Sequence, residues 1–397
     1  MVVSSLFGFS GKIIDKKTSK AIKEAKICDS KICVKSDENG TFNIQTKDEV
    51  LHVKAIGYRP YKIDNNSTVQ QLTPIRVKAL YLTFWGASPY SKTFKKALDL
   101  IDKTELNSII VDVKNEYGYT SYKTDVKKAN EYKTYQKRTI KDIDYFIKKL
   151  NEKDIYKIAR IVVFKDELQA SNNPDYAIKK EKTAKIWRNH DNMAWVDPFD
   201  KKSWKYVLDI AEDAAKKGFD EINFDYIRFP AKDGLKLKRK STQESRTKTI
   251  AAFIDYAQDR LRKYGVFISV DTYGNICWSN GDSNIGQTIE IFEKHADYVC
   301  PMLYPSGFAY GSFSFKYPAS KPYEVYARSI KHIKDKINPK KVRPWIQAFR
   351  DYKKQRLKYG KKEIQAQIKA CDDTNTNGWM LWSPSSKYNP QHYKASE

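Results

Sequence analysis

The residues from Ala79 onward repeat one pattern, a short apolar run followed by a stretch with the spacing of an amphipathic helix. This alternation is typical of parallel βα units, in which helices bury both faces of each strand. Eight apolar runs can be counted, at residues 79–85, 107–114, 156–164, 219–225, 265–271, 297–303, 342–348 and 378–383. Eight strands with interposed helices predict a closed (β/α)8 TIM barrel. A Rossmann-like sheet would have fewer strands and a glycine-rich phosphate loop, which this sequence lacks.

The predicted helices fall between these runs, at residues 94–103, 140–150, 203–217, 249–263, 322–336 and 363–372. Little sequence remains after Ser383, so the eighth helix of the barrel is the weakest part of this prediction.

The first 75 residues instead alternate short strands with turn signals, which predicts a small all-β sandwich. Residues 37–40, DENG, are expected to form a hairpin turn, and the polar residues 65–73 a linker. The segments GKIID, DENGTF and VKAIGYRPY make this region similar to the carboxypeptidase regulatory-like domain, a module without catalytic groups that implies a structural or tethering role. We therefore expect an α/β chain with a sandwich at 1–75 and the barrel at 76–397.

The charge balance limits the classes of partner. The chain carries 73 Lys and Arg against 48 Asp and Glu, a formal net charge of +25, which favours contact with polyanions. Lysine is spread along almost every segment and no nucleic-acid-binding motif accompanies it, so we expect no nucleic acid partner. No apolar stretch reaches the roughly 18 residues of a membrane span.

The cysteines form no CxxC or Cys/His pattern, so we expect neither a metal nor another cofactor. Their positions favour plain core residues; as an alternative, Cys28 and Cys33 flank a short turn and would bridge in an oxidising compartment. The apolar start, residues 1–9, lacks the basic flank and length of a signal sequence. Either an export signal precedes this sequence, or the protein stays in the cytoplasm.

Catalytic groups of TIM barrels lie at the carboxyl ends of the strands. Asp225 and Asp271 end two adjacent predicted strands, and glycoside cleavage needs two carboxyl groups on either side of the scissile bond. Asp112 and Glu116, on the second strand, are the rival partners of Asp225.

Aromatic and basic residues surround the same predicted barrel mouth. Flat rings would bind sugars, and arginines would keep a neighbouring carboxylate ionised, although burial in the core or a structural ion pair is the alternative for each residue. The predicted substrate-binding residues are Trp85, Lys114, Arg160, Arg228, Tyr273, Tyr304, Trp345, Gln347, Trp379 and Trp382.

Several collinear segments carry a resemblance to a known family. The sequences YLTFWGAS, IVDVKNEYG, RIVVFKD, FDYIRFP, VDTYG, ADYVCPMLYPS, RPWIQAF and GWMLWSPSSKY make residues 79–390 similar to a family of TIM-barrel glycoside hydrolases known as a domain of unknown function. The resemblance implies a carbohydrate-cleaving barrel, usually exported in bacteria to the periplasm or cell surface, with Asp225 of FDYIRFP as the leading catalytic residue.

The fourth strand is also similar to that of chitinase-type glycosidases, which carry a D-x-x-D-x-D-x-E pattern. Asp220 and Asp225 match, whereas Asn223 and Ile227 replace the middle Asp and the terminal Glu. This departure argues against substrate-assisted chitinase chemistry. The proton donor must then come from another strand, and Asp271 is preferred over Asp112 and Glu116.

The loop at 231–248 is rich in Lys and Arg, including Arg246, and would attract a substrate bearing carboxylate, phosphate or sulfate groups; a solvated loop is the alternative. The sequence thus predicts a glycoside hydrolase acting on a bacterial surface or extracellular polysaccharide. A glycan- or cell-wall-binding barrel without catalysis is the alternative, favoured by the missing glutamate of the fourth strand.

Overall fold

The computed structural model describes residues 7–64 and 67–396. The chain folds into two compact units. The first runs to Arg76 and includes Tyr256–Phe267, and the second comprises Val77–Asp255 and Ile268–Glu397. Among the described residues, no helix combines the length and the apolar character needed to cross a bilayer.

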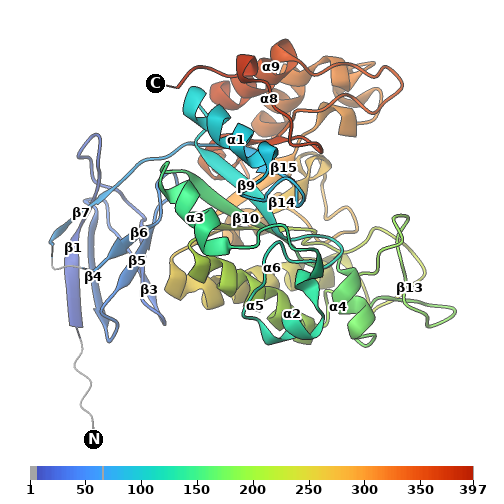
Figure 1. Ribbon diagram of the computed structural model, residues 1–397, viewed down its shortest axis with the longest axis horizontal. Coiled ribbons are helices and arrows are strands. Elements are labelled where there is room, and N and C mark those ends of the chain that lie inside the picture. Colours follow the sequence, from blue (N-terminus) through green and yellow to red (C-terminus); the bar gives the residue numbers. More distant parts are fainter. Residues whose placement is uncertain (1–6, 65–66, 397) are drawn as a thin grey trace, which may run out of the picture. The chain divides into compact units, whose positions relative to one another are not determined.

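The amino-terminal unit is a small sandwich of two sheets (Figure 1). One sheet has the order β4 (Thr41–Thr46), β1 (Phe7–Asp15), β7 (Val69–Leu72). The other has the order β3 (Cys33–Lys35), β2 (Lys26–Cys28), β5 (Leu51–Lys54), β6 (Tyr61–Ile63). Their inward side chains form one apolar core that includes Ile13, Ile27, Phe42, Ile44 and Val53. Its similarity to the carboxypeptidase regulatory-like domain stays a prediction.

Two local predictions for this unit are wrong. The DENG segment does form a turn, with the Asp37 carboxylate accepting the backbone N–H groups of Asn39 and Thr41, but it connects β3 to β4, which belong to different sheets. The turn is therefore an arch between sheets and not a hairpin. Residues 69–72 of the expected linker form strand β7, which pairs in parallel with β1; residues 65 and 66 of that linker lie outside the described residues.

The disulfide alternative is the one observed, since Cys28 and Cys33 are bonded across the paired strands β2 and β3. The sequence argument had favoured free thiols because five scattered cysteines make no framework. Cys277, Cys300 and Cys371 are free and buried, as expected for core residues.

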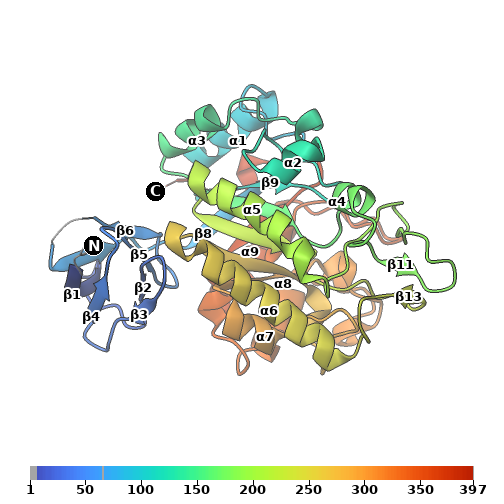
Figure 2. The same cartoon turned by 90° about the horizontal axis from the view of Figure 1, so that it is seen from below.

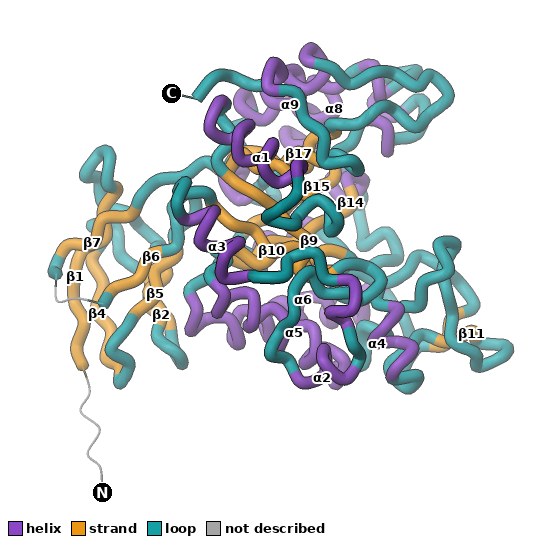
Figure 3. The backbone as a smooth tube through the Cα atoms, viewed as in Figure 1, coloured by secondary structure: helices purple, strands orange, loops and turns teal. Residues whose placement is uncertain are grey.

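The second unit contains a closed barrel of eight parallel strands, which confirms the predicted TIM architecture (Figures 1 and 3). All eight apolar runs supply one strand each. In chain order the strands are β8 (Val77–Leu82), β9 (Ser108–Lys114), β10 (Tyr156–Val162), β12 (Glu221–Asp225), β14 (Phe267–Tyr273), β15 (Tyr298–Met302), β16 (Trp345–Gln347) and β17 (Gly378–Trp382).

Helices surround these strands (Figures 2 and 3). The long ones are α1 (Lys92–Lys103), α3 (Ile143–Asn151), α5 (Lys201–Lys217), α6 (Gln243–Leu261), α8 (Pro322–His332) and α9 (Lys361–Asp373). The sequence analysis missed α7 (Ile289–His295), because seven residues are too few to show helical periodicity. After β17 the described chain has only the short 3-10 turn Pro390–His392, so the predicted weakness of the eighth helix is confirmed.

Loops at the barrel mouth carry further elements. The short helices α2 (Lys127–Glu131) and α4 (Glu167–Asn172) follow β9 and β10. Strand β11 (Lys179–Lys180), in the loop after β10, pairs antiparallel with β13 (Leu235–Lys236), in the loop after β12. The two loops therefore join into one projecting lobe, which Figure 2 shows at the β11 and β13 labels.

The barrel interior is polar in layers. Alternate residues of a strand face the same side, and Glu221, Asn223 and Asp225 of β12 point into the barrel at successive heights. Glu221 is fully buried and pairs with Arg343, Asn223 donates to Asp271, and Asp225 pairs with Arg160. The last of these layers is the one at the strands' carboxyl ends, where barrel enzymes place their chemistry.

Candidate active site

One arginine and three aspartates form the core of this upper layer. Arg160 lies 2.5 Å from Asp112 through Nη1, forms an ion pair with Asp225 through Nη2, and has its Nε 3.8 Å from Asp271. All four side chains are almost completely buried. A single guanidinium cannot balance three buried carboxylates, so this arrangement favours binding of a proton.

Among these three carboxyl groups, Asp271 has the pKa that its surroundings raise most clearly. Burial, followed by the negative charge of Asp225, raises the pKa of Asp271 well above its usual value. Its Oδ1 accepts hydrogen bonds from Trp345 Nε1 at 2.7 Å and from Asn223 Nδ2 at 3.0 Å, which fix the side chain. Burial also raises the pKa of Asp112, whose Oδ2 accepts the Tyr81 hydroxyl at 2.5 Å.

The separation of Asp225 and Asp271 is bounded by their shared neighbour. Arg160 Nε lies 3.2 Å from Asp225 Oδ2 and 3.8 Å from Asp271 Oδ2, so these oxygens are at most about 7 Å apart. The two carboxyl groups of glycoside hydrolases are separated by roughly 5 to 9.5 Å. The pair therefore lies close enough to act on one glycosidic bond.

A cavity of about 200 Å³ opens above this layer, and Asp225 and Asp271 are both among its lining residues. Charged groups line its floor and aromatic rings its wall, the combination expected of a polar small-molecule site. Its lining residues are Arg160, Asp225, Tyr226, Arg228, Asp271, Tyr273, Met302, Tyr304, Trp345 and Trp382.

The backbone just after Asp225 is strained. Tyr226 has a φ of +49°, in the left-handed region that side chains with a Cβ rarely adopt. Its N–H donates to Asp225 Oδ1 at 2.6 Å, which holds the carboxylate at the cavity floor. Strain of this kind, kept by the surrounding structure, is often found at functional sites.

The sequence-predicted residues divide into two groups. Eight of them line the cavity, namely Asp225, Asp271, Arg160, Arg228, Tyr273, Tyr304, Trp345 and Trp382. Asp112 lies beneath the cavity as a partner of Arg160, and Glu116 is half-buried near Asp112.

The remaining predicted residues lie elsewhere. The ring of Trp85 is largely exposed at 66%, whereas Trp379 is buried in the core. Lys114 is fully buried in an ion pair with Asp166. Gln347 binds Ser306 in the loop after β15, and so helps to hold the segment that carries Tyr304.

Four residues of the site were not among the predicted catalytic or substrate-binding residues. Tyr226 and Met302 line the cavity, Asn223 binds Asp271, and Tyr81 stacks on Trp382 while donating to Asp112. The alternation along β12 was the available signal for Asn223, since residues 221, 223 and 225 share one face. No comparable signal marks Met302.

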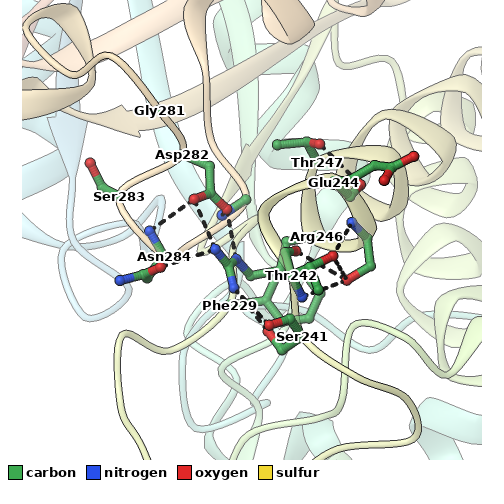
Figure 4. Close-up of polar contacts among 12 residues, drawn as sticks. Phe229, Ser241, Thr242, Glu244, Arg246, Thr247, Gly281, Asp282, Ser283 and Asn284 are labelled. Carbon is green, nitrogen blue, oxygen red and sulfur yellow. Dashed lines mark hydrogen bonds and ion pairs between the residues drawn. The ribbon is translucent and has the colours of Figure 1, made fainter.

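One residue of the basic loop is structural. Arg246 is 7% exposed and forms a two-point ion pair with Asp282, with Nε–Oδ2 at 2.6 Å and Nη2–Oδ1 at 2.9 Å (Figure 4). The pair fixes the start of α6 to the loop after β14, and the Phe229 N–H bonds Ile285 O of the same loop. Arg246 is therefore not available to a substrate, contrary to its place in the predicted anion-attracting loop.

Comparison with solved structures finds the same barrel architecture. The glycoside hydrolase domain of PgaB (BpsB) from Bordetella bronchiseptica matches with a TM-score of 0.58 at 12% identity, over 79% of this chain and 95% of that one. The carboxy-terminal domain of a protein described as "putative chitinase" from Desulfitobacterium hafniense matches with a TM-score of 0.50 at 9% identity, over 80% of this chain and 96% of that one. At these low identities, the structural matches show a shared fold and nothing further about this chain.

A hypothetical protein from Ruminiclostridium thermocellum is 34% identical over 48% of this chain and 96% of its own, with a TM-score of 0.44. Among curated proteins, none matches the chain. A family profile described as "Putative glycosyl hydrolase domain" matches residues 79–388, which include nearly the whole barrel and every cavity residue. The chain belongs to this glycosyl hydrolase domain family.

Proposed function

We propose that this protein hydrolyses a glycosidic bond within a polysaccharide, with Asp225 and Asp271 as the two catalytic carboxyl groups. The observation that carries the proposal is that both groups line one cavity next to Arg160 but in different surroundings: burial raises the pKa of Asp271 well above its usual value, whereas Asp225 forms a close ion pair with Arg160. Glycoside hydrolysis requires such a difference, because one carboxyl group must be protonated and the other ionised.

Each carboxyl group has a distinct role. Asp271, protonated because of its burial, donates its proton to the leaving oxygen. Asp225, paired with Arg160, serves as the anion that attacks the anomeric carbon or activates water. Asp112 does not line the cavity and acts as a positioning residue that orients Arg160.

The cavity wall suits a sugar. Tyr273, Tyr304 and Trp382 present aromatic faces or edges around the two carboxyl groups, and sugar rings pack on such surfaces through their C–H groups. The stack of Tyr81 on Trp382, with centroids 4.2 Å apart, fixes the indole from below.

The Cys28–Cys33 disulfide bears on the compartment. Disulfides persist in oxidising environments, so the bond supports export to the periplasm or cell surface. A bacterial surface or extracellular polysaccharide is the substrate available there.

The role of Asp271 can be tested with the leaving group. We expect Asp271→Asn to lower the rate on polysaccharides by about 10²- to 10³-fold, because the leaving oxygen is no longer protonated. On dinitrophenyl glycosides, whose leaving group needs no proton, the variant should keep most of the wild-type rate. Equal losses on both substrate types, measured by reducing-end release and absorbance, would contradict the assignment of Asp271 as the acid.

The same residue should make stability depend on pH. The pKa of Asp271 is raised in the folded state, so the folded state binds the proton more tightly and stability falls as pH rises from near 3.8 through the raised pKa. Asparagine does not titrate, and the melting temperature of Asp271→Asn relative to wild type should therefore increase over this window. A difference that stays constant with pH in thermal unfolding would count against the raised pKa.

A glycan-binding protein without catalysis is the second candidate. It is favoured by Ile227, which occupies the position of the chitinase acid and is completely buried. The hydrogen bonds of Asp225 also favour it, because Oδ1 accepts the Tyr226 N–H and Oδ2 accepts Arg160, so both oxygens already have a partner. Incubating purified protein with a panel of bacterial polysaccharides discriminates the two, because new reducing ends exclude a purely binding role.

A further inference from the structure

Arg228 is a cation at the cavity wall with an unusual surrounding. Its guanidinium lies over the rings of Trp195 and Tyr273, each with a centroid 4.8 Å away, and of Tyr226 at 5.2 Å. It donates to Phe229 O at 3.1 Å through Nη1 and to the Tyr273 hydroxyl at 3.0 Å through Nη2. The side chain is thus held in one place by aromatic and neutral groups.

The two arginines of the cavity differ in their counter-charges. Arg160 has three carboxylates within 4 Å, whereas within residues 7–64 and 67–396 no acidic side chain forms an ion pair with Arg228. A guanidinium has five N–H donors, of which Arg228 uses two in these hydrogen bonds. Arg228 thus brings a positive charge without an acidic ion-pair partner, and N–H groups not used in these two bonds, to the cavity that Asp225 and Asp271 also line.

A second cationic feature adjoins this arginine. The projecting lobe, residues 179–185 and 232–240, contains nine Lys and Arg against one Glu and one Asp. The Ile178 N–H at its base bonds Trp195 O at 2.9 Å, and Trp195 is a ring that covers Arg228. The lobe therefore extends the positive charge outward from the cavity wall.

We propose that the cavity recognises an anionic sugar, with Arg228 binding the carboxylate, phosphate or sulfate that the sugar carries and the lobe attracting further anionic groups of the same chain. The substrate class is then an acidic polysaccharide. This inference rests on the proposed glycan-cleaving function, because it takes the ligand of the cavity to be a sugar, but the binding can be measured without catalysis. Arginine is suited to the role because its planar fork gives two parallel hydrogen bonds to an oxyanion.

The test uses an array of oligosaccharides in matched sets, each neutral backbone beside forms that carry a carboxylate, a phosphate or a sulfate. The full chain is applied as wild type, Arg228→Gln, Arg228→Lys and Arg328→Gln. Arg328 is a matched control, because it is exposed on α8, lies over the Phe315 ring at 4.5 Å, donates to Phe313 O, and does not line the cavity.

We expect wild type and Arg328→Gln to bind at least one anionic form about tenfold or more tightly than its neutral backbone, since hydrogen bonds to charged groups are the strong ones. Arg228→Gln should lose this preference, with a clearly larger loss of affinity for the anionic form than for the neutral one, and Arg228→Lys should keep part of the preference. The anion that shows the largest Arg228-dependent preference identifies the group on the substrate.

Equal binding of neutral and anionic forms by wild type would overturn the inference, as would an undiminished preference in Arg228→Gln or an equal loss on both forms. These outcomes are separable from failure of the proposed function. If no glycan yields reducing ends but the Arg228-dependent preference is found, the hydrolase proposal fails and the anion site stands. If neutral glycans are cleaved as fast as acidic ones, the hydrolase proposal stands and the anion site fails.

Discussion

Replacing Asp225 with asparagine is expected to lower the release of reducing ends by about 10⁴-fold or more, the largest effect on activity predicted for this protein. The amide cannot serve as nucleophile or base, so activated aryl glycosides should lose activity as well, in contrast to Asp271→Asn. The fold should persist, because Arg160 keeps its 2.5 Å contact to Asp112. Circular dichroism and the melting temperature check this second point.

Glu116→Gln provides the matched control for that experiment. It makes the same carboxylate-to-amide change close enough to Asp112 to affect its pKa, but Glu116 does not line the cavity. We expect nearly full activity. An inactive Glu116→Gln beside an active Asp225→Asn would contradict the role of Asp225 and move it to Glu116, which the sequence analysis named only as a rival partner of Asp225.

The strand pattern predicted the barrel because the same pattern, a short apolar run followed by a helical stretch, is repeated along the chain. Each of the eight runs is short and largely buried, so its apolar residues remain recognisable even where polar residues intrude, as Asp112 does in β9 and Glu221 does in β12. The rule that chemistry lies at strand ends then singled out Asp225 and Asp271 without knowledge of any contact. Two residues on neighbouring strands were enough to predict a shared cavity.

The wrong predictions for basic residues arise because Lys and Arg can either bind a substrate or form a structural ion pair. Lys114 and Arg160 lie near the carboxyl ends of adjacent strands. Lys114 forms a buried ion pair with Asp166, whereas Arg160 pairs with aspartates at the cavity. Arg246 belongs to a lysine-rich loop but is buried against Asp282, 36 residues later. Such pairings depend on three-dimensional register, which residue types and spacing do not encode.

Replacing Glu221 with alanine is expected to lower the free energy of unfolding by about 3–5 kcal/mol, although the residue lies far from the cavity. Arg343 places Nη1 2.8 Å from both oxygens of Glu221, and both side chains are completely buried at the lower end of the barrel. Tyr156 also donates to Glu221 Oε2 at 2.9 Å. Alanine would leave a buried guanidinium without its counter-charge, which urea unfolding should detect.

A double replacement separates the loss of the pair from the orphaned charge. If the cost comes from the unpaired Arg343, then Glu221→Ala combined with Arg343→Met should recover most of the lost stability, because apolar groups of similar volume can replace a buried ion pair at little cost. The exposed pair of Glu244 and Lys248 on α6 is the control, and Glu244→Gln should leave the urea midpoint unchanged. A double variant as unstable as Glu221→Ala alone would instead mean that the carboxylate is needed for packing and hydrogen bonding to Tyr156, and not mainly as a counter-ion. Packing and hydrogen bonding would then contribute as much as charge pairing to the stability of the polar layers of the barrel.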